Sequence, residues 1–243
     1  MRESIRPDET LDVLCNEKVR LIQKKGGYRL SIDALLLANF IVLKRRETLL
    51  DIGAGCGIIP IYISRRGCEN RLVGIEIQDE LYELSLRNKE LNRCANVEFV
   101  KGDVRTAGKE LGNFHVIVSN PPYTKERTGR MSPGQSRLIA RYESALNLSA
   151  LLSVATSLLM THGRLYVIYP AKRLAELMYT SRPLSLEPKR LRLVHSRSGE
   201  PAVLCLVECM KGGGVNLKVE PPLYIYKDDD YTQEVKAYFC EGA

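Results

Sequence analysis

Short apolar runs alternate with longer amphipathic segments through the central part of the chain. The runs are rich in Val, Ile and Leu at consecutive positions, which is typical of strands buried on both faces of a parallel sheet. Residues 58–66 and 79–91 lie between such runs and carry apolar residues at helical spacing. The pattern therefore predicts βαβ units and a parallel sheet. The predicted strands are 49–52, 72–77, 97–100 and 114–119.

The pattern continues after residue 145 and then changes direction. An amphipathic segment at 145–160 predicts a helix ended by Gly163, and the apolar residues 165–169 predict another strand. Two later apolar runs flank a Ser-Gly-Glu-Pro turn, which indicates an antiparallel pair. We therefore expect an α/β fold with a mostly parallel seven-stranded sheet, helices on both faces and an antiparallel last strand. The remaining elements are a helix at 171–179 and strands at 191–195 and 202–209.

Both ends of the chain are expected to pack on this core. Residues 19–23 and 28–30 flank a Lys-Lys-Gly-Gly stretch, which predicts a hairpin with a Gly-Gly turn. Residues 34–43 form an apolar helix in this interpretation, and another helix is predicted near 231–238. The expected parts are an N-terminal hairpin and helix at 1–46, a core at 47–210, and a C-terminal tail at 211–243 that packs back on the core.

The composition favours a globular protein without a membrane segment. At 44% hydrophobic residues, the 243-residue chain can bury a substantial core. No apolar run has the length of a membrane-spanning helix, and residues 1–9 lack the apolar region of a signal peptide. We therefore expect a cytoplasmic protein, monomer or homodimer, that contacts no membrane. The seven cysteines form no C-x-x-C pair, which favours reduced thiols and no metal centre.

A glycine-rich loop, Asp51–Gly57, follows the first core strand and precedes a helix. Three glycines let the backbone turn sharply and approach a ligand, and the helix N-terminus points N–H groups into the same space. Glu76 ends the next strand, where a carboxylate can accept both hydroxyl groups of a ribose. A dinucleotide fingerprint is spaced G-x-G-x-x-G, whereas this loop reads G-x-G-x-G. A nicotinamide cofactor, a different nucleoside cofactor and a tight turn without a ligand remain alternatives here.

A second motif, Asn120–Tyr123, follows the strand at 114–119. Its two prolines stop the strand, so an amide and an aromatic ring are held at the sheet edge where α/β proteins bind ligands. The amide carbonyl of Asn120 and the backbone carbonyl of Pro121 can accept the two N–H bonds of a planar amine, and Tyr123 can stack on it. An ordinary strand-ending turn with a core tyrosine is the alternative.

Together, the two motifs resemble those of class I S-adenosylmethionine (SAM)-dependent amino-methyltransferases, which have a Rossmann-like fold. The resemblance implies that SAM is the cofactor and that methyl transfer needs positioning more than a strong base. It also implies that Asp103 accepts from the adenine of SAM and that the Val104 N–H contacts the ring, although Asp103 can equally cap a helix. The implied cofactor-binding residues are Asp51, Gly53, Ala54, Gly55, Gly57, Glu76, Ile77, Asp103, Val104 and Asn120, and the implied catalytic residues are Asn120, Pro121, Pro122 and Tyr123.

Segments outside these motifs are similar to the bacterial tRNA1(Val) (adenine-37-N6)-methyltransferase family. They include 28–38, 188–197 and 221–226, so the resemblance extends from about residue 19 to 238. One departure is Tyr142, where the family pattern leads us to expect histidine. The resemblance implies N6-methylation of adenine 37 in a valine tRNA. A base in an anticodon loop can be turned into a pocket at limited unstacking cost.

The net charge of +7 is concentrated in two segments, 125–141 and 182–197, each with five basic residues and one acidic residue. Such segments can hold tRNA phosphates, or they can be solvated basic faces. The alternative functions are a release-factor glutamine N5-methyltransferase, whose relatives carry a sizeable helical domain before the core, another RNA or DNA amino-methyltransferase, and a non-enzymatic RNA-binding module. The predicted substrate-binding residues are Lys125, Arg127, Arg130, Arg137, Arg141, Lys189, Arg190 and Arg192.

Overall fold

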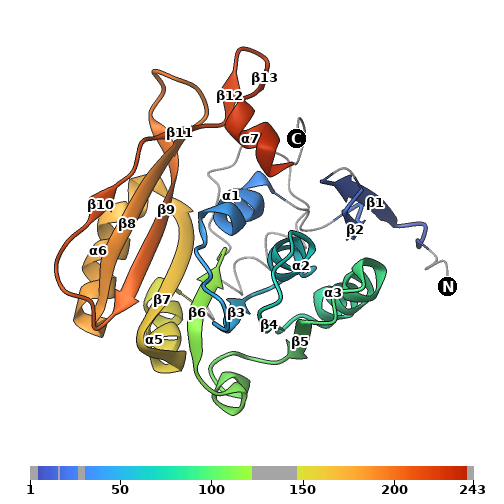
Figure 1. Ribbon diagram of the computed structural model, residues 1–243, viewed down its shortest axis with the longest axis horizontal. Coiled ribbons are helices and arrows are strands. Elements are labelled where there is room, and N and C mark those ends of the chain that lie inside the picture. Colours follow the sequence, from blue (N-terminus) through green and yellow to red (C-terminus); the bar gives the residue numbers. More distant parts are fainter. Residues whose placement is uncertain (1–4, 16, 27–30, 122–146, 240–243) are drawn as a thin grey trace.

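A central mixed sheet carries helices on both faces (Figure 1). The computed structural model describes residues 5–15, 17–26, 31–121 and 147–239. In that part of the chain the sheet has nine strands in the order β10-β8-β9-β7-β6-β3-β4-β5, with β11 also pairing with β8. Two of the nine, β10 and β11, contain two residues each, which leaves seven long strands. These are β3 (Leu49–Ile52), β4 (Leu72–Glu76), β5 (Val97–Lys101), β6 (Phe114–Ser119), β7 (Leu159–Pro170), β8 (Leu186–His195) and β9 (Ala202–Lys211).

The strand directions confirm the predicted fold class. Strands β3 to β7 run parallel to one another, and β9 is antiparallel to both of its neighbours, β7 and β8. The central strands β3 and β4 are buried along their whole length, which explains their near-continuous apolar sequence. The antiparallel pair predicted at 191–195 and 202–209 is therefore present, and both of its strands are longer than predicted.

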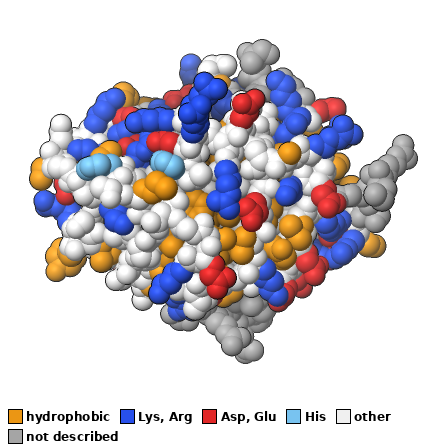
Figure 2. Space-filling view, turned by 60° about the horizontal axis from the view of Figure 1, so that its bottom comes forward, with side chains coloured by type: hydrophobic (Ala, Val, Ile, Leu, Met, Phe, Trp, Pro, Cys, Tyr) orange, Lys and Arg blue, Asp and Glu red, His pale blue; other side chains and the backbone are white. Residues whose placement is uncertain are grey.

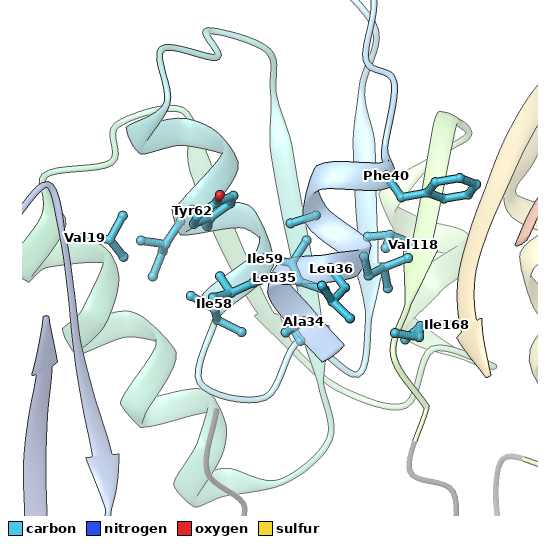
Figure 3. Packing of buried hydrophobic residues seen from close by; sticks show 14 of the residues in the cluster. Val19, Ala34, Leu35, Leu36, Phe40, Ile58, Ile59, Tyr62, Val118 and Ile168 are labelled. Atoms are coloured by element: carbon cyan, nitrogen blue, oxygen red, sulfur yellow. The ribbon is translucent and has the colours of Figure 1, made fainter. Parts of the chain in front are cut away.

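Two apolar layers enclose the sheet. One layer contains α1 (Ile32–Phe40), α2 (Ile58–Arg65) and α3 (Asp79–Asn92), and the other contains α5 (Leu148–Leu158) and α6 (Leu174–Ser181). Side chains of α1 and α2 point toward one another and toward the sheet residues Val118 and Ile168 (Figure 3). No helix in the described ranges is long and apolar enough to cross a membrane.

The junction of α5 and β7 differs from the prediction. A helix was expected at 145–160, of which 145 and 146 lie outside the described residues; the helix ends at Leu158 and β7 starts directly at Leu159. The pairing of β6 with β7 shifts register between Phe114 and Val116, which leaves an irregular segment around Gly163. A Cβ at Gly163 would lie 2.9 Å from the Met160 carbonyl oxygen. The glycine therefore permits a close backbone approach inside the strand and does not end the helix.

The N-terminal hairpin prediction is tested only in part. Residues 19–23 do form a strand, β2 (Val19–Lys24), and it pairs with the preceding strand β1 (Glu9–Leu14), which was not predicted. The predicted partner at 28–30 lies outside the described residues, so that pairing stays a prediction. The turn between β1 and β2 uses non-glycine residues with positive φ, namely Cys15 at 55° and Glu17 at 67°. It therefore lacks the glycine or proline signal from which hairpins are predicted.

The C-terminal tail returns to the core. The strands β10 (Lys218–Val219) and β11 (Leu223–Tyr224) extend the sheet beyond β8, and a small hairpin, β12 (Tyr226–Lys227) with β13 (Asp230–Tyr231), leads to α7 (Gln233–Tyr238). The Tyr62 hydroxyl of α2 donates to the Tyr238 carbonyl at 2.7 Å. The Cys15 N–H donates to the Phe239 carbonyl at 3.0 Å. The tail thus contacts both the N-terminal hairpin and α2.

Candidate functional site

Four of the polar residues singled out in the sequence lie at or near the carboxyl ends of neighbouring strands of the sheet. Asp51 of β3 pairs in register with Gly74 of β4 on one side and with Val118 of β6 on the other. Glu76 is the last residue of β4, and Asn120 directly follows β6. Asp103 comes two residues after β5. These side chains therefore share the carboxyl edge of the parallel strands, where open α/β sheets bind ligands.

The glycine loop crosses over the end of β4. The Gly53 N–H donates to the Ile75 carbonyl at 3.0 Å, and the backbone at Gly53, Gly55 and Gly57 has φ values of 75°, 57° and 87°. Other residues adopt this left-handed conformation only with strain. A Cβ at Gly57 would also lie 2.4 Å from the Phe99 ring, whereas a Cβ at Gly53 or Gly55 would meet no atom of the described residues within 4 Å. Within the described part of the chain, the loop therefore packs tightly at its helix end and leaves open space at its first two glycines.

Glu76 holds the shape of this loop from the next strand. Its carboxylate accepts from the Gly55 N–H at 2.9 Å and from the Gln78 N–H at 2.9 Å, and the residue is only 4% exposed. Burial raises the pKa of Glu76, while the two N–H donors oppose that shift. Each carboxylate oxygen has two lone pairs, so both oxygens can still accept a hydroxyl from a ligand.

Asp51 is the second buried carboxyl group beneath the loop. It is 2% exposed, and burial together with the charge of Glu76 raises the pKa of Asp51 to about 8. The Asp51 carboxyl is therefore mainly protonated at neutral pH, which avoids two adjacent buried charges. Burial likewise raises the pKa of the Cys56 thiol to about 11, so this loop cysteine is a neutral thiol at neutral pH. The six cysteines in the described ranges are all free.

Asp103 has a partner that sequence reasoning missed. Its carboxylate accepts from the Arg105 backbone N–H at 2.9 Å, and both of its oxygens lie 2.9 Å from the Arg105 Nε. This guanidinium holds the pKa of Asp103 below its usual range. Val104 is buried beside it, whereas Ile77 is 42% exposed next to Glu76. The site edge therefore offers one ionised carboxylate and one exposed apolar side chain.

The Asn120 motif is only partly described. Asn120 and Pro121 are half-buried, while Pro122 and Tyr123 lie outside the described residues. The Ser119 hydroxyl, which sequence reasoning also missed, donates to the Ile52 carbonyl at 2.9 Å and ties the end of β6 to the end of β3. Ile52 directly precedes Gly53 of the glycine loop, and Ser119 directly precedes Asn120. This buried hydrogen bond therefore holds Asn120 close to the start of the loop.

The predicted substrate-binding cations fall into two groups. Lys125, Arg127, Arg130, Arg137 and Arg141 lie outside the described residues. The others lie on β8 and have partners within the protein: Lys189 Nζ donates to the Gly214 carbonyl at 2.9 Å, Arg190 contacts Glu208 at 2.8 Å and Glu220 at 2.9 Å, and Arg192 contacts Glu234 at 2.5 Å.

These contacts attach the C-terminal tail to the sheet, since Glu220 and Glu234 both belong to the tail. The Arg190 guanidinium also lies 4.3 Å from the centre of the Phe40 ring. On the face shown in Figure 2, Lys and Arg side chains are interspersed with Asp and Glu. Part of the positive charge of residues 182–197 therefore serves to pair with glutamates inside the protein, which the sequence alone did not reveal.

The strand order, the glycine loop after β3 and the acidic residue at the end of β4 define a Rossmann-like methyltransferase fold. Among solved structures, the chain is similar to a predicted O-methyltransferase from Agrobacterium tumefaciens, with a TM-score of 0.69 and 24% identity, covering 87% of this chain and 98% of that one. It is also similar to a methyltransferase from Pyrococcus furiosus, with a TM-score of 0.57 and 20% identity, covering 79% and 88%. The model of the methyltransferase small domain matches residues 28–178, and the chain belongs to this family.

Curated relatives carry a more specific name. A tRNA1(Val) (adenine(37)-N6)-methyltransferase from Porphyromonas gingivalis is 34% identical over 152 residues, which are 60% of this chain and 59% of that protein. The match therefore spans less than two thirds of that relative. Proteins of the same name from Photobacterium profundum and Actinobacillus pleuropneumoniae are 26% and 28% identical, and these matches cover 86% and 87% of this chain and 88% and 89% of the relatives.

Proposed function

We propose that the protein is a SAM-dependent methyltransferase that modifies N6 of an adenine in tRNA, namely adenine 37 of a valine tRNA. The observation that carries the proposal is the placement of the glycine loop, Glu76 and Asn120 at adjacent strand ends of the sheet. A nucleoside cofactor and a planar amine would thus meet at one edge. The names of the curated relatives support tRNA as the substrate.

The residues present fit SAM. The open space at Gly53 and Gly55 would admit the cofactor close to the backbone, and Glu76 would accept from the ribose hydroxyls. Asp103 would accept from the adenine amino group, and the exposed Ile77 side chain would cover one face of the ring. When bound, SAM supplies an electrophilic methyl group on a sulfonium. The other proposed cofactor contacts are Asp51, Ala54, Gly57, Val104 and Asn120.

The target amine would be held by the motif after β6. The Asn120 side-chain carbonyl and the Pro121 backbone carbonyl would accept its two N–H bonds, which directs the nitrogen lone pair outward. Pro122 would keep the turn rigid, and Tyr123 would stack on the base. The amine becomes acidic only after it is alkylated, so its proton can then be lost to water. No strong general base is required in this arrangement.

The tRNA would be recognised mainly through its backbone. A single-stranded loop presents the base at limited unstacking cost, and basic residues after the Asn120 motif would contact phosphates in a salt-dependent way. We place this activity in the cytoplasm, with the protein as a monomer or homodimer and without a metal. The proposed phosphate contacts are Lys125, Arg127, Arg130, Arg137, Arg141, Lys189, Arg190 and Arg192.

A labelling experiment tests the substrate directly. The protein is incubated with methyl-labelled SAM and separate pools of tRNA, ribosomal RNA, DNA and protein, and labelled tRNA is digested to locate the modified nucleoside. We expect label in tRNA as N6-methyladenosine at position 37. Label in release factors with none in tRNA would support the glutamine methyltransferase instead. Label in no pool, together with no SAM binding by calorimetry, would contradict the proposed function.

A further inference from the structure

Two buried asparagines on α3 attach the N-terminal hairpin to the core. Asn88 accepts from the Ile22 N–H at 2.7 Å and donates to the Ile22 carbonyl at 3.1 Å. Asn92, one turn later, accepts from the Arg20 N–H at 2.9 Å and donates to the Arg20 carbonyl at 2.6 Å. Residues 20 and 22 are two positions apart on β2, so their backbone N–H and carbonyl groups point to the same edge of the strand. The two asparagine amides take the place of a neighbouring strand and satisfy these groups.

Only one of the two asparagines also reaches the glycine loop. The Asn88 amide donates to the Cys56 carbonyl at 3.0 Å, and the Asn88 side chain is completely buried. Asn92 instead donates its second N–H to the Asn88 carbonyl at 2.7 Å. Cys56 stands between Gly55, whose N–H binds Glu76, and Gly57, which starts α2. A single side chain therefore joins β2, α3 and the loop.

This connection matters because the loop is rich in glycine. Three glycines with positive φ give the loop more conformational freedom in the absence of restraints than other residues would. On the hairpin side of the loop, the buried Asn88 amide supplies such a restraint, since both of its N–H groups donate hydrogen bonds. Loss of one of these bonds would leave a buried polar group unsatisfied, which costs free energy. On the other side, Glu76 supplies the restraint through the Gly55 N–H.

We propose that Asn88 is a positioning residue that ties the N-terminal hairpin to the glycine loop, so that docking of the hairpin and binding of the cofactor stabilise each other. The inference rests on the proposed function insofar as the loop holds SAM. By linkage, docking of the hairpin tightens SAM binding by the same factor by which bound SAM tightens docking of the hairpin. Asn92 contributes to docking alone and serves as the matched control.

The test compares Asn88→Ala with Asn92→Ala, since each removes two bonds to β2 and only the first removes the bond to the loop. Amide hydrogen exchange is measured without ligand, and SAM binding is measured by calorimetry. We expect both variants to speed exchange in β2, but only Asn88→Ala to speed exchange at 53–57. We expect Asn88→Ala to weaken SAM binding roughly threefold to tenfold, as for one lost hydrogen bond, with Asn92→Ala within twofold of wild type.

A third variant separates loosening of the hairpin from movement of the loop. Arg87→Met removes the contacts of 2.7 Å and 3.0 Å that Arg87 makes with the buried Glu9 of β1, without touching the loop. It should speed exchange in β1 and β2 and leave 53–57 unchanged. Equal exchange at 53–57 in Asn88→Ala and Asn92→Ala would overturn the inference, whether or not SAM binds.

The readouts also distinguish the inference from the proposed function. A wild-type protein that binds no SAM contradicts the proposed function, while the ligand-free exchange data still decide the role of Asn88. Kinetically, a positioning role raises KM for SAM and leaves kcat within twofold at saturation, whereas general destabilisation lowers the active fraction in all variants alike. If Asn88→Ala does not fold, Asn88→Ser keeps a small polar side chain and introduces no buried charge, and the same differences from Asn92→Ala are expected.

Discussion

Replacing Asp51 with asparagine should change how the stability of the ligand-free protein depends on pH. The native pKa of Asp51 is raised to about 8 from 3.8 by burial and by the charge of Glu76. Between these values the folded protein keeps a proton on Asp51 that the unfolded chain has released. Stability therefore falls as pH rises through this window, because the unfolded state binds fewer protons. Asparagine has nearly the same shape as aspartate but cannot ionise. In Asp51→Asn, this fall in unfolding free energy with rising pH should therefore be absent.

The slope gives the size of the effect. One proton of difference corresponds to about 1.4 kcal/mol of unfolding free energy per pH unit. Across two units, from about pH 5.5 to 7.5, wild type should lose about 3 kcal/mol relative to Asp51→Asn, and the gap should stop growing near pH 8. Asp51 is 2% exposed, so little solvent screening reduces this effect. Burial also raises the pKa of Glu76, and this carboxyl is present in both proteins.

Urea unfolding of both proteins at half-unit pH intervals, without SAM, measures this gap. The m-value is compared as well, because a changed m-value would indicate a changed unfolded or native ensemble. Two stability curves that stay parallel between pH 5.5 and 7.5 would show that Asp51 is ionised in the folded protein. In that case the argument that burial keeps Asp51 protonated beside Glu76 would be refuted.

Four further changes test other parts of the site. Asn120→Ala should reduce methyl transfer at least a hundredfold while SAM binding by calorimetry stays within threefold, because Asn120 would contact the amine; near-normal turnover would refute this. Gly74→Ala should destabilise the protein by about 1–3 kcal/mol in urea unfolding, since its Cβ would lie 2.6 Å from the Phe99 ring, and Phe99→Leu in the same chain should recover part of that loss. Arg192→Met should speed hydrogen exchange of α7 several-fold through loss of the Glu234 pair, with β3 and β4 unaffected. Replacing Arg127, Arg130 and Arg137 with Ala should weaken tRNA binding in filter assays and flatten its salt dependence, and an unchanged slope would remove these residues from the interface.

The parallel part of the fold could be predicted because its signal is local. The runs that became β3, β4 and β6 are mostly apolar on both faces, while β5 alternates Val97 and Phe99 with the exposed Glu98, and each run is separated from the next by a segment of helical spacing or by a turn. β1 was not predicted, and its burial is the reverse of the usual pattern: the apolar Leu11 and Val13 are exposed, whereas the charged Glu9 is buried against Arg87 of α3. Arg87 is far from Glu9 in the sequence, so no local pattern could predict this pair.

The candidate site divides in a similar way. Asp51, Glu76, Asp103 and Asn120 could be named from motif spacing because each lies within three residues of the carboxyl end of a predicted strand. Arg105 beside Asp103 and Ser119 beneath the loop were missed, since neither belongs to the motif and only their contacts show a role. Arg190 and Arg192, which the sequence offers only as phosphate contacts, also pair with Glu208, Glu220 and Glu234 within the protein, and no sequence pattern indicated these pairs.

By itself, the sequence determined the order of strands and helices in the core and the chemical groups at the strand ends, because backbone propensity, side-chain periodicity and turn residues act over a few neighbouring positions. The tertiary structure alone decided which strand pairs with β2, which basic side chains bind carboxylates, and which carboxyl group keeps its proton. Those outcomes depend on burial and on charges brought together from distant parts of the chain, as when β3 and β4 place Asp51 beneath the same loop that Glu76 holds.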